Sequence, residues 1–259
     1  MLQGNHWRTW DILIIGSFPF IATAITITFS TSQIVSLFFF FILPSLYLTI
    51  RQPSLLVKAG LITLSTIPFT IIIDFFAIQD GSWWVETIFP FRYLNGIPLE
   101  DFIWCASWFY YVIAIYETFI DRSSTDSPPS KRAKTLVFGW FLAGSLFLFI
   151  YPLISHLVIP YFYAFFSFIL GLIPLAFFLV HYPKLWRKFS LLAAWLFVVN
   201  ILHEISALTT HQWYFPGHHF IGWVQLFSFQ FPIEEFMLWM ILGAMYLLAW
   251  YEYFVDDRK

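Results

Sequence analysis

Residues 59–79 have the sequence AGLITLSTIPFTIIIDFFAIQ, in which Asp74 is the one ionisable side chain. A bilayer core about 30 Å thick is crossed by about 20 helical residues, and a helix satisfies its own backbone hydrogen bonds. The run is therefore typical of a transmembrane helix. An ionised acid at this depth costs about 2.5–3.5 kcal/mol on insertion scales, so Asp74 predicts an interior cavity or a bonding partner.

Apolar runs of this kind recur along the whole chain. The other seven are residues 11–30, 33–50, 98–120, 135–155, 158–181, 189–209 and 231–254. Hydrophobic residues make up 60% of the 259 positions and charged residues only 11%, whereas a water-soluble domain has about a quarter charged. We predict an all-α, polytopic protein with about eight transmembrane helices, surrounded by membrane lipid. The net charge of −2 provides no basic surface for nucleic acid.

The basic residues are distributed unequally between the two sides of these helices. Twelve of the 13 Lys and Arg residues fall on one side, and only Arg92 falls on the other. Cytoplasmic loops carry the excess of Lys and Arg, so both termini are predicted to be cytoplasmic. We expect the location to be the cytoplasmic membrane of a prokaryote. Acids at the inner helix ends are interpreted as solvated by water and headgroups beside these bases; they are Asp11, Glu117, Asp121, Glu252, Asp256 and Asp257.

The chain also contains an internal duplication. Residues 123–134 form a polar, proline-bearing linker between a first membrane repeat, 1–122, and a second, 135–259. An offset of 130 aligns several pairs, which are Pro44 with Pro174, Pro53 with Pro183, Lys58 with Lys188, Asp74 with Glu204 and Trp83 with Trp213. Because each half contains an even number of helices, the repeats are predicted to be parallel, with the site between them.

Two kinds of acid stand out in this repeat. Asp74 and Glu204 lie inside apolar helices, short of their outer ends. Glu100 and Glu234 lie near the outer starts of the helices that follow. We therefore expect four carboxyls at one depth. Carboxyls clustered in a water-poor site cannot all ionise, so one keeps its proton while another acts as a base, which suits proton addition and removal.

Each of these helix starts has the pattern Pro-x-Glu-Asp/Glu. Adjacent acids on a helix point about 100° apart, so only one member of each pair faces the interior. Glu100 and Glu234 are the predicted inward members. The predicted supporting residues are Asp101, Glu235, Pro98 and Pro232. A helix start alone also explains Pro followed by acids, because acids are stabilised at the positive end of the helix dipole.

Aromatic side chains surround the outer loops. An interfacial belt explains most of them, but those facing a cavity would stabilise a carbocation through their π faces. The candidates for substrate binding are Trp83, Trp104, Trp108, Trp213, Tyr214 and Trp239.

No cofactor or metal is expected from the motifs. His203-Glu204 resembles the start of a zinc-protease helix, but Ala207 stands where the second histidine would be. Cys105 is the only cysteine, and no glycine-rich phosphate loop is present.

The duplicated acids resemble the integral-membrane lycopene cyclase domain family. The similarity covers about residues 33–120 and 160–254. It is carried by Asp74-Phe75-Phe76-Ala77, Pro98-Leu99-Glu100-Asp101, Glu204-Ile205-Ser206-Ala207 and Pro232-Ile233-Glu234-Glu235. The resemblance implies a tandem fusion of two cyclase modules. It also implies redox-neutral cyclisation of the linear end groups of lycopene, or a related linear carotenoid, to β-type rings through a carbocation.

In that chemistry Glu100 and Glu234 would be the proton donor or acceptor, and Asp74 and Glu204 would adjust their protonation. Replacing Glu100 or Glu234 by Gln is then expected to remove cyclisation. The sequence leaves the ring type and the formation of a homo-oligomer open.

Three other functions also remain open. Paired acids inside a helical bundle occur in proton and ion transporters, a carotenoid end-group hydratase uses the same acid chemistry with water as nucleophile, and a noncatalytic carotenoid-binding protein needs only the cavity.

Overall fold

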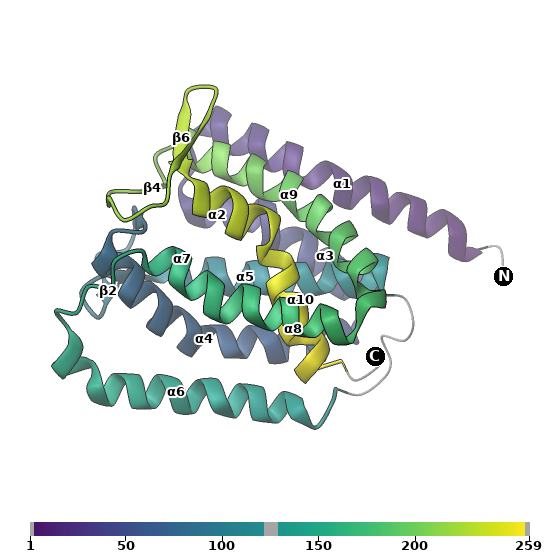
Figure 1. Ribbon diagram of the computed structural model, residues 1–259. Coiled ribbons are helices and arrows are strands. Elements are labelled where there is room, and N and C mark those ends of the chain that lie inside the picture. Colours follow the sequence, from purple (N-terminus) through teal and green to yellow (C-terminus); the bar gives the residue numbers. More distant parts are fainter. Residues whose placement is uncertain (1–2, 122–128, 257–259) are drawn as a thin grey trace.

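The computed structural model describes residues 3–121 and 129–256, with side chains from Thr9 onward, as a helical bundle with short strands at one end (Figure 1). The α-helices are α1 Gln3–Phe29, α2 Gln33–Leu37, α3 Leu43–Arg51, α4 Leu55–Asp80, α5 Leu99–Ile115, α6 Arg132–Ile154, α7 Phe162–Phe166, α8 Ile173–His181, α9 Trp186–Thr209 and α10 Gly243–Phe254. Segments with π-helical bonding are η1 Phe38–Ile42, η2 Tyr116–Ile120, η3 Ser167–Leu172 and η5 Glu235–Ile241, and η4 Pro183–Leu185 is a 3₁₀ turn.

Seven of the helical segments in the described part of the chain are long and apolar enough to cross a membrane. An eighth is formed if η5 and α10 count as one span bent by 41°. The prediction of a mainly helical chain with about eight helices long and apolar enough to span a membrane is therefore confirmed at the level of seven or eight such helices. α1 begins and α10 ends at the same end of the bundle, opposite the strands (Figure 1).

The start of α6 corrects the predicted linker. α6 begins at Arg132, inside the expected linker of residues 123–134, of which 123–128 lie outside the described residues. The Arg132 amide donates a hydrogen bond to Ser130 Oγ at 3.2 Å. A serine oxygen that accepts from an amide of the first turn is a typical helix start, and the following Lys and Arg residues are compatible with helix.

The π-helical segments η1 and η3 are each explained by a proline that follows them. η1 is followed by Pro44 in the first turn of α3, and η3 is followed by Pro174 in the first turn of α8. Proline has no amide hydrogen, and its ring crowds the carbonyl of the preceding turn, so the helix widens there. Both widened segments stay in one continuous apolar span.

Short strands in the outer loops depart from the expected all-helical chain. β1 Trp84–Val85 pairs antiparallel with β4 Trp213–Tyr214 and thereby joins the two loops. Two hairpins complete the set, namely β2 Arg92–Tyr93 with β3 Ile97–Pro98, and β5 Trp223–Leu226 with β6 Phe229–Pro232.

Two glycines hold these loops together. The Gly217 amide donates to the Gly81 carbonyl at 2.9 Å, and Gly81 has a φ of 74°. A Cβ atom on Gly217 would lie 2.7 Å from the Gly81 oxygen. Only glycine allows this close approach, which fixes the two loops as one cap over the bundle.

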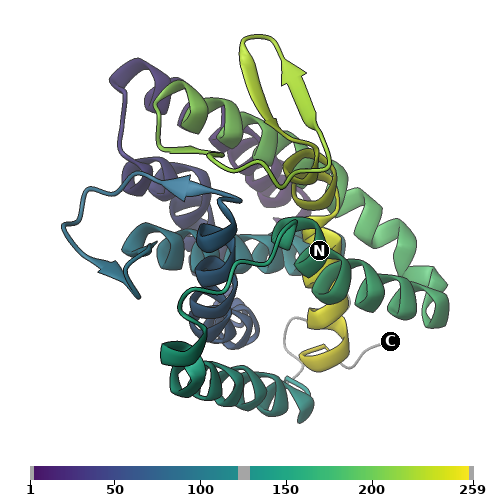
Figure 2. The ribbon, with the colours of Figure 1, turned by 60° about the vertical axis from the view of Figure 1, so that its left-hand side comes forward.

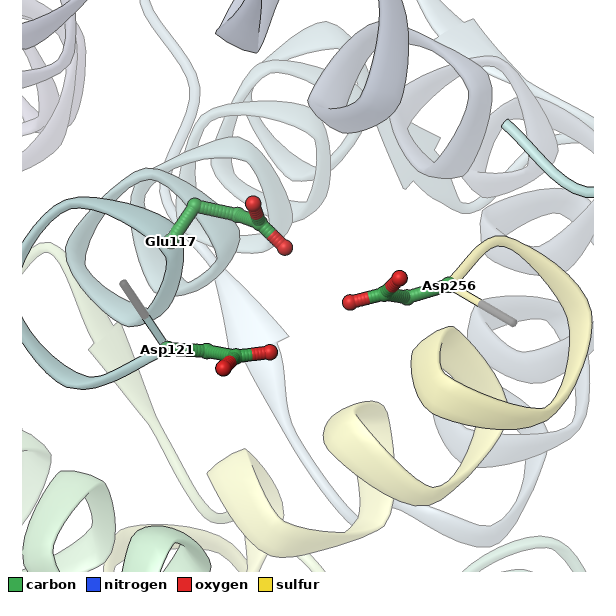
Figure 3. Close-up of side chains that lie close together, drawn as sticks. All are labelled: Glu117, Asp121 and Asp256. Carbon is green, nitrogen blue, oxygen red and sulfur yellow. The ribbon is translucent and has the colours of Figure 1, made fainter. Parts of the chain in front are cut away.

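At the inner end, the acids expected to be solvated are buried instead, and that interpretation is wrong for Glu117, Asp121, Glu252 and Asp256. Each is at most 3% exposed. Glu117, Asp121 and Asp256 point toward one another between the ends of the helices (Figure 3). The helices that carry these acids pack together at this end, so their inner faces do not reach the headgroups. Asp257 lies outside the described residues, and Asp11 pairs with Arg51 at 3.2 Å.

Buried partners compensate these inner acids. Lys58 Nζ lies 3.3 Å from Glu117 Oε2, and the Tyr251 hydroxyl donates to Glu117 Oε1 at 2.6 Å. The Tyr116 hydroxyl donates to Glu252, and Lys188 Nζ lies 2.7 Å from Asp121. Buried charges are tolerated only when they are paired and hydrogen-bonded in this way.

α6 lies at the edge of the bundle in both views (Figures 1 and 2) and packs mainly on α4. A Cβ atom on Gly144 would lie 2.7 Å from Pro68 Cβ, whereas one on Gly139 would meet nothing within 4 Å. The contact between α4 and α6 therefore depends on the small residue at position 144.

We expect Gly144→Leu to displace α6 from α4 and to lower the free energy of unfolding by about 1–3 kcal/mol, the usual cost of overpacking. Gly139→Leu on the same helix is the matched control and should leave stability within about 0.5 kcal/mol. Thermal unfolding of the detergent-solubilised variants measures both. Equal stability of the two variants would contradict the packing described for Gly144.

Candidate active site

A cavity lies beneath the outer cap, between α2, α4, α5, α7 and η5. The empty space between its side chains is about 730 Å³, a volume that includes the open side of the cavity. Three acids line it, namely Asp74, Asp101 and Glu235. The rest of its wall is mostly aromatic, from Phe69, Trp83, Trp104, Tyr163, Phe166, Trp213, Phe215 and Trp239. The cavity thus brings carboxyls from both halves of the chain into one apolar chamber.

The predicted orientation of the acids at the starts of α5 and η5 is wrong. The Ile88 amide donates to Glu100 Oε1 at 2.9 Å, and the Thr87 hydroxyl donates to Glu100 Oε2 at 2.7 Å. The Ile221 amide donates to Glu234 Oε1 at 2.6 Å. Glu100 and Glu234 therefore bind the outer loops.

Asp101 and Glu235, predicted as supporting residues, occupy the cavity instead. The reason is the fold of the loops. Each loop returns over the helix start and presents an amide to the first acid, so the second acid, about 100° further around the helix, faces the bundle interior. The sequence shows the pair but not the position of the loop amides.

The first acid pair is Asp74 with Asp101. Both are buried, and their carboxyls lie within hydrogen-bonding reach of each other. The Trp83 indole is within reach of Asp74. A hydrogen bond between two carboxyls needs one proton, because an ionised carboxylate only accepts. The pair is therefore built to carry a proton.

The second acid pair has a different environment. The Tyr163 hydroxyl donates to Glu235 Oε2 at 2.5 Å, and the Trp213 indole donates to Glu204 Oε1 at 3.2 Å. Glu204 is buried behind the cavity wall and does not line it. Both carboxyls on this side thus accept a hydrogen bond from a neutral aromatic side chain.

Gln33 and Tyr163 are among the cavity residues that were not expected from the sequence. Both line the cavity, and Tyr163 binds Glu235 directly. The offset of 130 that aligns Asp74 with Glu204 also aligns Gln33 with Tyr163. That alignment was the available signal, but two different residue types at one position did not indicate a shared role.

Of the six aromatic residues predicted to bind substrate, four line this cavity, one lines a neighbouring cavity and one lines neither. Trp83, Trp104, Trp213 and Trp239 line the cavity. Trp108 lines a neighbouring cavity and donates a hydrogen bond from its indole to Asn200 Oδ1 at 3.0 Å.

Tyr214 lines neither cavity and is 45% exposed, so the structure does not bring it together with the other predicted aromatic residues. Successive side chains of a strand point to opposite faces, and Trp213 of β4 is the one that faces inward.

The two prolines predicted as supporting residues lie at strand-to-helix junctions. Pro98 ends β3 with an extended backbone, φ −77° and ψ 160°, directly before α5. Pro232 ends β6 and leads into the segment that carries Glu234 and Glu235. A fixed φ at these junctions orients the acids that follow.

The neighbouring cavity extends the chamber toward the inner half of the bundle. It encloses about 700 Å³ and shares three wall residues with the first cavity, namely Phe69, Phe166 and Trp239. Its other walls include Trp108, Phe109, Trp140, Tyr246 and Trp250, together with Gly171 and Gly243. The two cavities therefore adjoin, and both are largely apolar.

Other groups of titratable residues do not line this space. Asp80, at the end of α4, pairs with His219 Nδ1 at 2.6 Å in the outer cap. Within residues 9–121 and 129–256, the one His, Cys, Asp and Glu grouping with metal-ligand spacing is Glu117, Asp121 and Asp256 (Figure 3). Lys58 and Lys188 already occupy oxygens of two of these acids.

Comparisons with known proteins identify no relative of this chain. No family model, no curated protein and no solved structure matches the chain. The fold and the site define a polytopic helical membrane protein with a cavity lined by acids and aromatic rings.

Proposed function

We propose that this protein cyclises the linear end groups of lycopene, or of a related linear carotenoid, by acid–base catalysis. One observation carries the proposal, namely that Asp74, Asp101 and Glu235 share a chamber whose remaining wall is mostly aromatic. The resemblance of the duplicated acids to the membrane lycopene cyclase domain family supports the same substrate class.

The chemistry requires a proton donor, a cation-tolerant wall and a proton acceptor. A donor carboxyl protonates the terminal alkene, and the tertiary cation is attacked by the neighbouring alkene, which closes the ring. Loss of a proton to a base then forms the ring double bond. Trp83, Trp104 and Trp239 present aromatic rings to this space, and each cation–π contact contributes about 0.5–2 kcal/mol.

The shape of the space supports a long apolar substrate. The end group would lie in the outer cavity beside the acids, and the polyene would extend into the inner cavity along Trp108 and Trp140. A substrate that partitions into the bilayer needs such a dry passage at membrane depth.

The proposed arrangement of the chain is two parallel repeats related by an axis along the membrane normal. Contacts between residues that are equivalent at an offset of 135 support it. The rings of Trp104 and Trp239 lie 5.0 Å apart, and those of Tyr116 and Tyr251 lie 6.2 Å apart. A residue contacts its own equivalent only beside the axis that relates the two copies.

Reciprocal hydrogen bonds support the same axis. Tyr116 donates to Glu252, and Tyr251 donates to Glu117, so the two halves exchange equivalent bonds. The excess of Lys and Arg at the inner end supports cytoplasmic termini, and the cytoplasmic membrane of a prokaryote is the proposed location.

Expression in cells that accumulate lycopene tests the proposal. We expect lycopene to be converted to products with one or two rings and an unchanged oxidation state, identified by chromatography and mass spectrometry. The matched control is the Asp74→Asn/Asp101→Asn double variant at equal membrane content. Hydroxylated, unringed products would indicate a hydratase, and unaltered lycopene with the intact protein would refute enzymatic cyclisation.

A further inference from the structure

The acids that line the chamber differ in their hydrogen-bond partners. On one wall, Asp74 and Asp101 lie within hydrogen-bonding reach of each other, so that this pair carries a proton. Elsewhere on the wall, Glu235 accepts a hydrogen bond of 2.5 Å from the Tyr163 hydroxyl. The two sides therefore differ in the partner of the carboxyl, which is a second carboxyl for Asp101 and a phenol for Glu235.

Tyr163 also holds Glu235 in a defined place. The Tyr163 ring packs edge-on to Trp83 at 5.2 Å and stacks on Phe166 at 5.6 Å. A ring packed on two sides has little freedom, so its hydroxyl fixes one oxygen of Glu235 against the chamber wall. Glu235 lies in η5, whose π-helical bonding sets it apart from the regular first turn of α5.

The residue equivalent to Tyr163 in the first half of the chain does not hold Asp101 in this way. Gln33 occupies the place of Tyr163 in the first half and lines the same chamber. Among the residues that the structure describes, no hydrogen-bond donor reaches Gln33 Oε1 or Asp101 Oδ2. Asp101 is thus oriented by Asp74, whereas Glu235 is oriented by a phenol.

Resting on the proposed function, we infer that Glu235 is the base that removes the ring proton and that Tyr163 is the positioning residue that selects which proton is lost. The cation left after ring closure has acidic protons on three neighbouring carbons. Removal from either of the two ring carbons gives a double bond at a different position in the ring, and removal from the methyl carbon gives an exocyclic double bond. The place of the Glu235 carboxylate therefore determines the ring type.

The step balances without a further reactant. One carboxyl of the Asp74–Asp101 pair gives a proton to the terminal alkene, a carbon–carbon bond forms, and Glu235 takes one proton from the ring cation. Product and substrate are isomers, and the proton passes back to the aspartate pair between turnovers. Nothing is oxidised or reduced.

Tyr163→Phe tests the positioning role, because it removes the hydroxyl and keeps the packed ring. We expect the fraction of minor ring isomers among the rings formed to rise at least fivefold, because the Glu235 carboxylate is no longer held in one place. Tyr161→Phe is the matched control, since Tyr161 is a half-exposed tyrosine two residues away that lines neither cavity. Its isomer ratio should equal that of the wild type.

Glu235→Gln tests the base. We expect lycopene still to be consumed, with mixed ring isomers and hydroxylated rings formed when water captures the cation. An unchanged isomer ratio in Tyr163→Phe would overturn the inference, as would complete loss of lycopene consumption in a folded Glu235→Gln variant, which would assign Glu235 to protonation. Wild-type protein that forms no rings would instead refute the proposed function itself.

Discussion

Replacing Asp101 by Asn is expected to reduce ring formation by about 10²–10⁴-fold, the usual contribution of a general acid. The amide preserves the shape of the side chain but carries no acidic proton. It also leaves Asp74 without the neighbouring Asp101 carboxyl, with which Asp74 shares a proton. Pigment analysis of lycopene-accumulating cells, normalised to the membrane content of the variant, measures the loss.

Glu100→Gln is the matched control, one residue away on the same helical turn. Glu100 is 1% exposed, and its Oε1 accepts from the Ile88 amide at 2.9 Å and from the Thr87 hydroxyl at 2.9 Å. The single oxygen of a Gln can accept both of these bonds, whereas the bond from Thr87 to Oε2 is lost. We expect activity to remain within about tenfold of the wild type, which reverses the expectation drawn from the sequence alone. Retained activity in Asp101→Asn with loss in Glu100→Gln would contradict the orientation of α5.

Replacing Lys58 by Met is expected to destabilise the inner end of the bundle by about 3–5 kcal/mol, the cost of leaving one member of a buried ion pair behind. Lys58 is 2% exposed, and its Nζ lies 3.3 Å from Glu117 Oε2. For a protein of this size the loss corresponds to about 10 °C in the unfolding temperature. Thermal unfolding in detergent measures it.

A second substitution separates charge from packing at this site. Glu117→Gln in the Lys58→Met background removes the unpaired charge and keeps an acceptor for the Tyr251 hydroxyl, so it should restore at least half of the lost stability. Lys134→Met, at an exposed position of α6, should change stability by less than about 0.5 kcal/mol. No recovery in the double variant would show that the charge of Glu117 is not what Lys58 compensates.

The sequence predicts the helical framework well because transmembrane helices follow from local composition. All eight apolar runs coincide with helical segments, and the positions of Asp74 and Glu204 inside α4 and α9 are also as expected. These features depend on the length of an apolar run and on the cost of a charge within it. Neither requires knowledge of the neighbouring helices.

Orientation within the site is less predictable. Glu100 and Asp101 are adjacent on one helix start, and their order alone does not show which faces the cavity. The Ile88 amide selects Glu100, and that amide is placed by a loop of irregular backbone. The role of Tyr163 depends on the approach of α7 to η5, which local sequence does not encode.

The burial of acids at the inner end is likewise not predictable from the local sequence. Glu117 and Glu252 resemble solvated helix-end acids in a linear sequence, but the packing of α5, η2 and α10 encloses them with tyrosines from the opposite half. Hydrophobic runs and their charges determined by themselves that the chain is a helical membrane protein with intramembrane acids. Only the tertiary structure decided which carboxyls meet in the chamber, because side-chain direction depends on contacts between segments far apart in the chain.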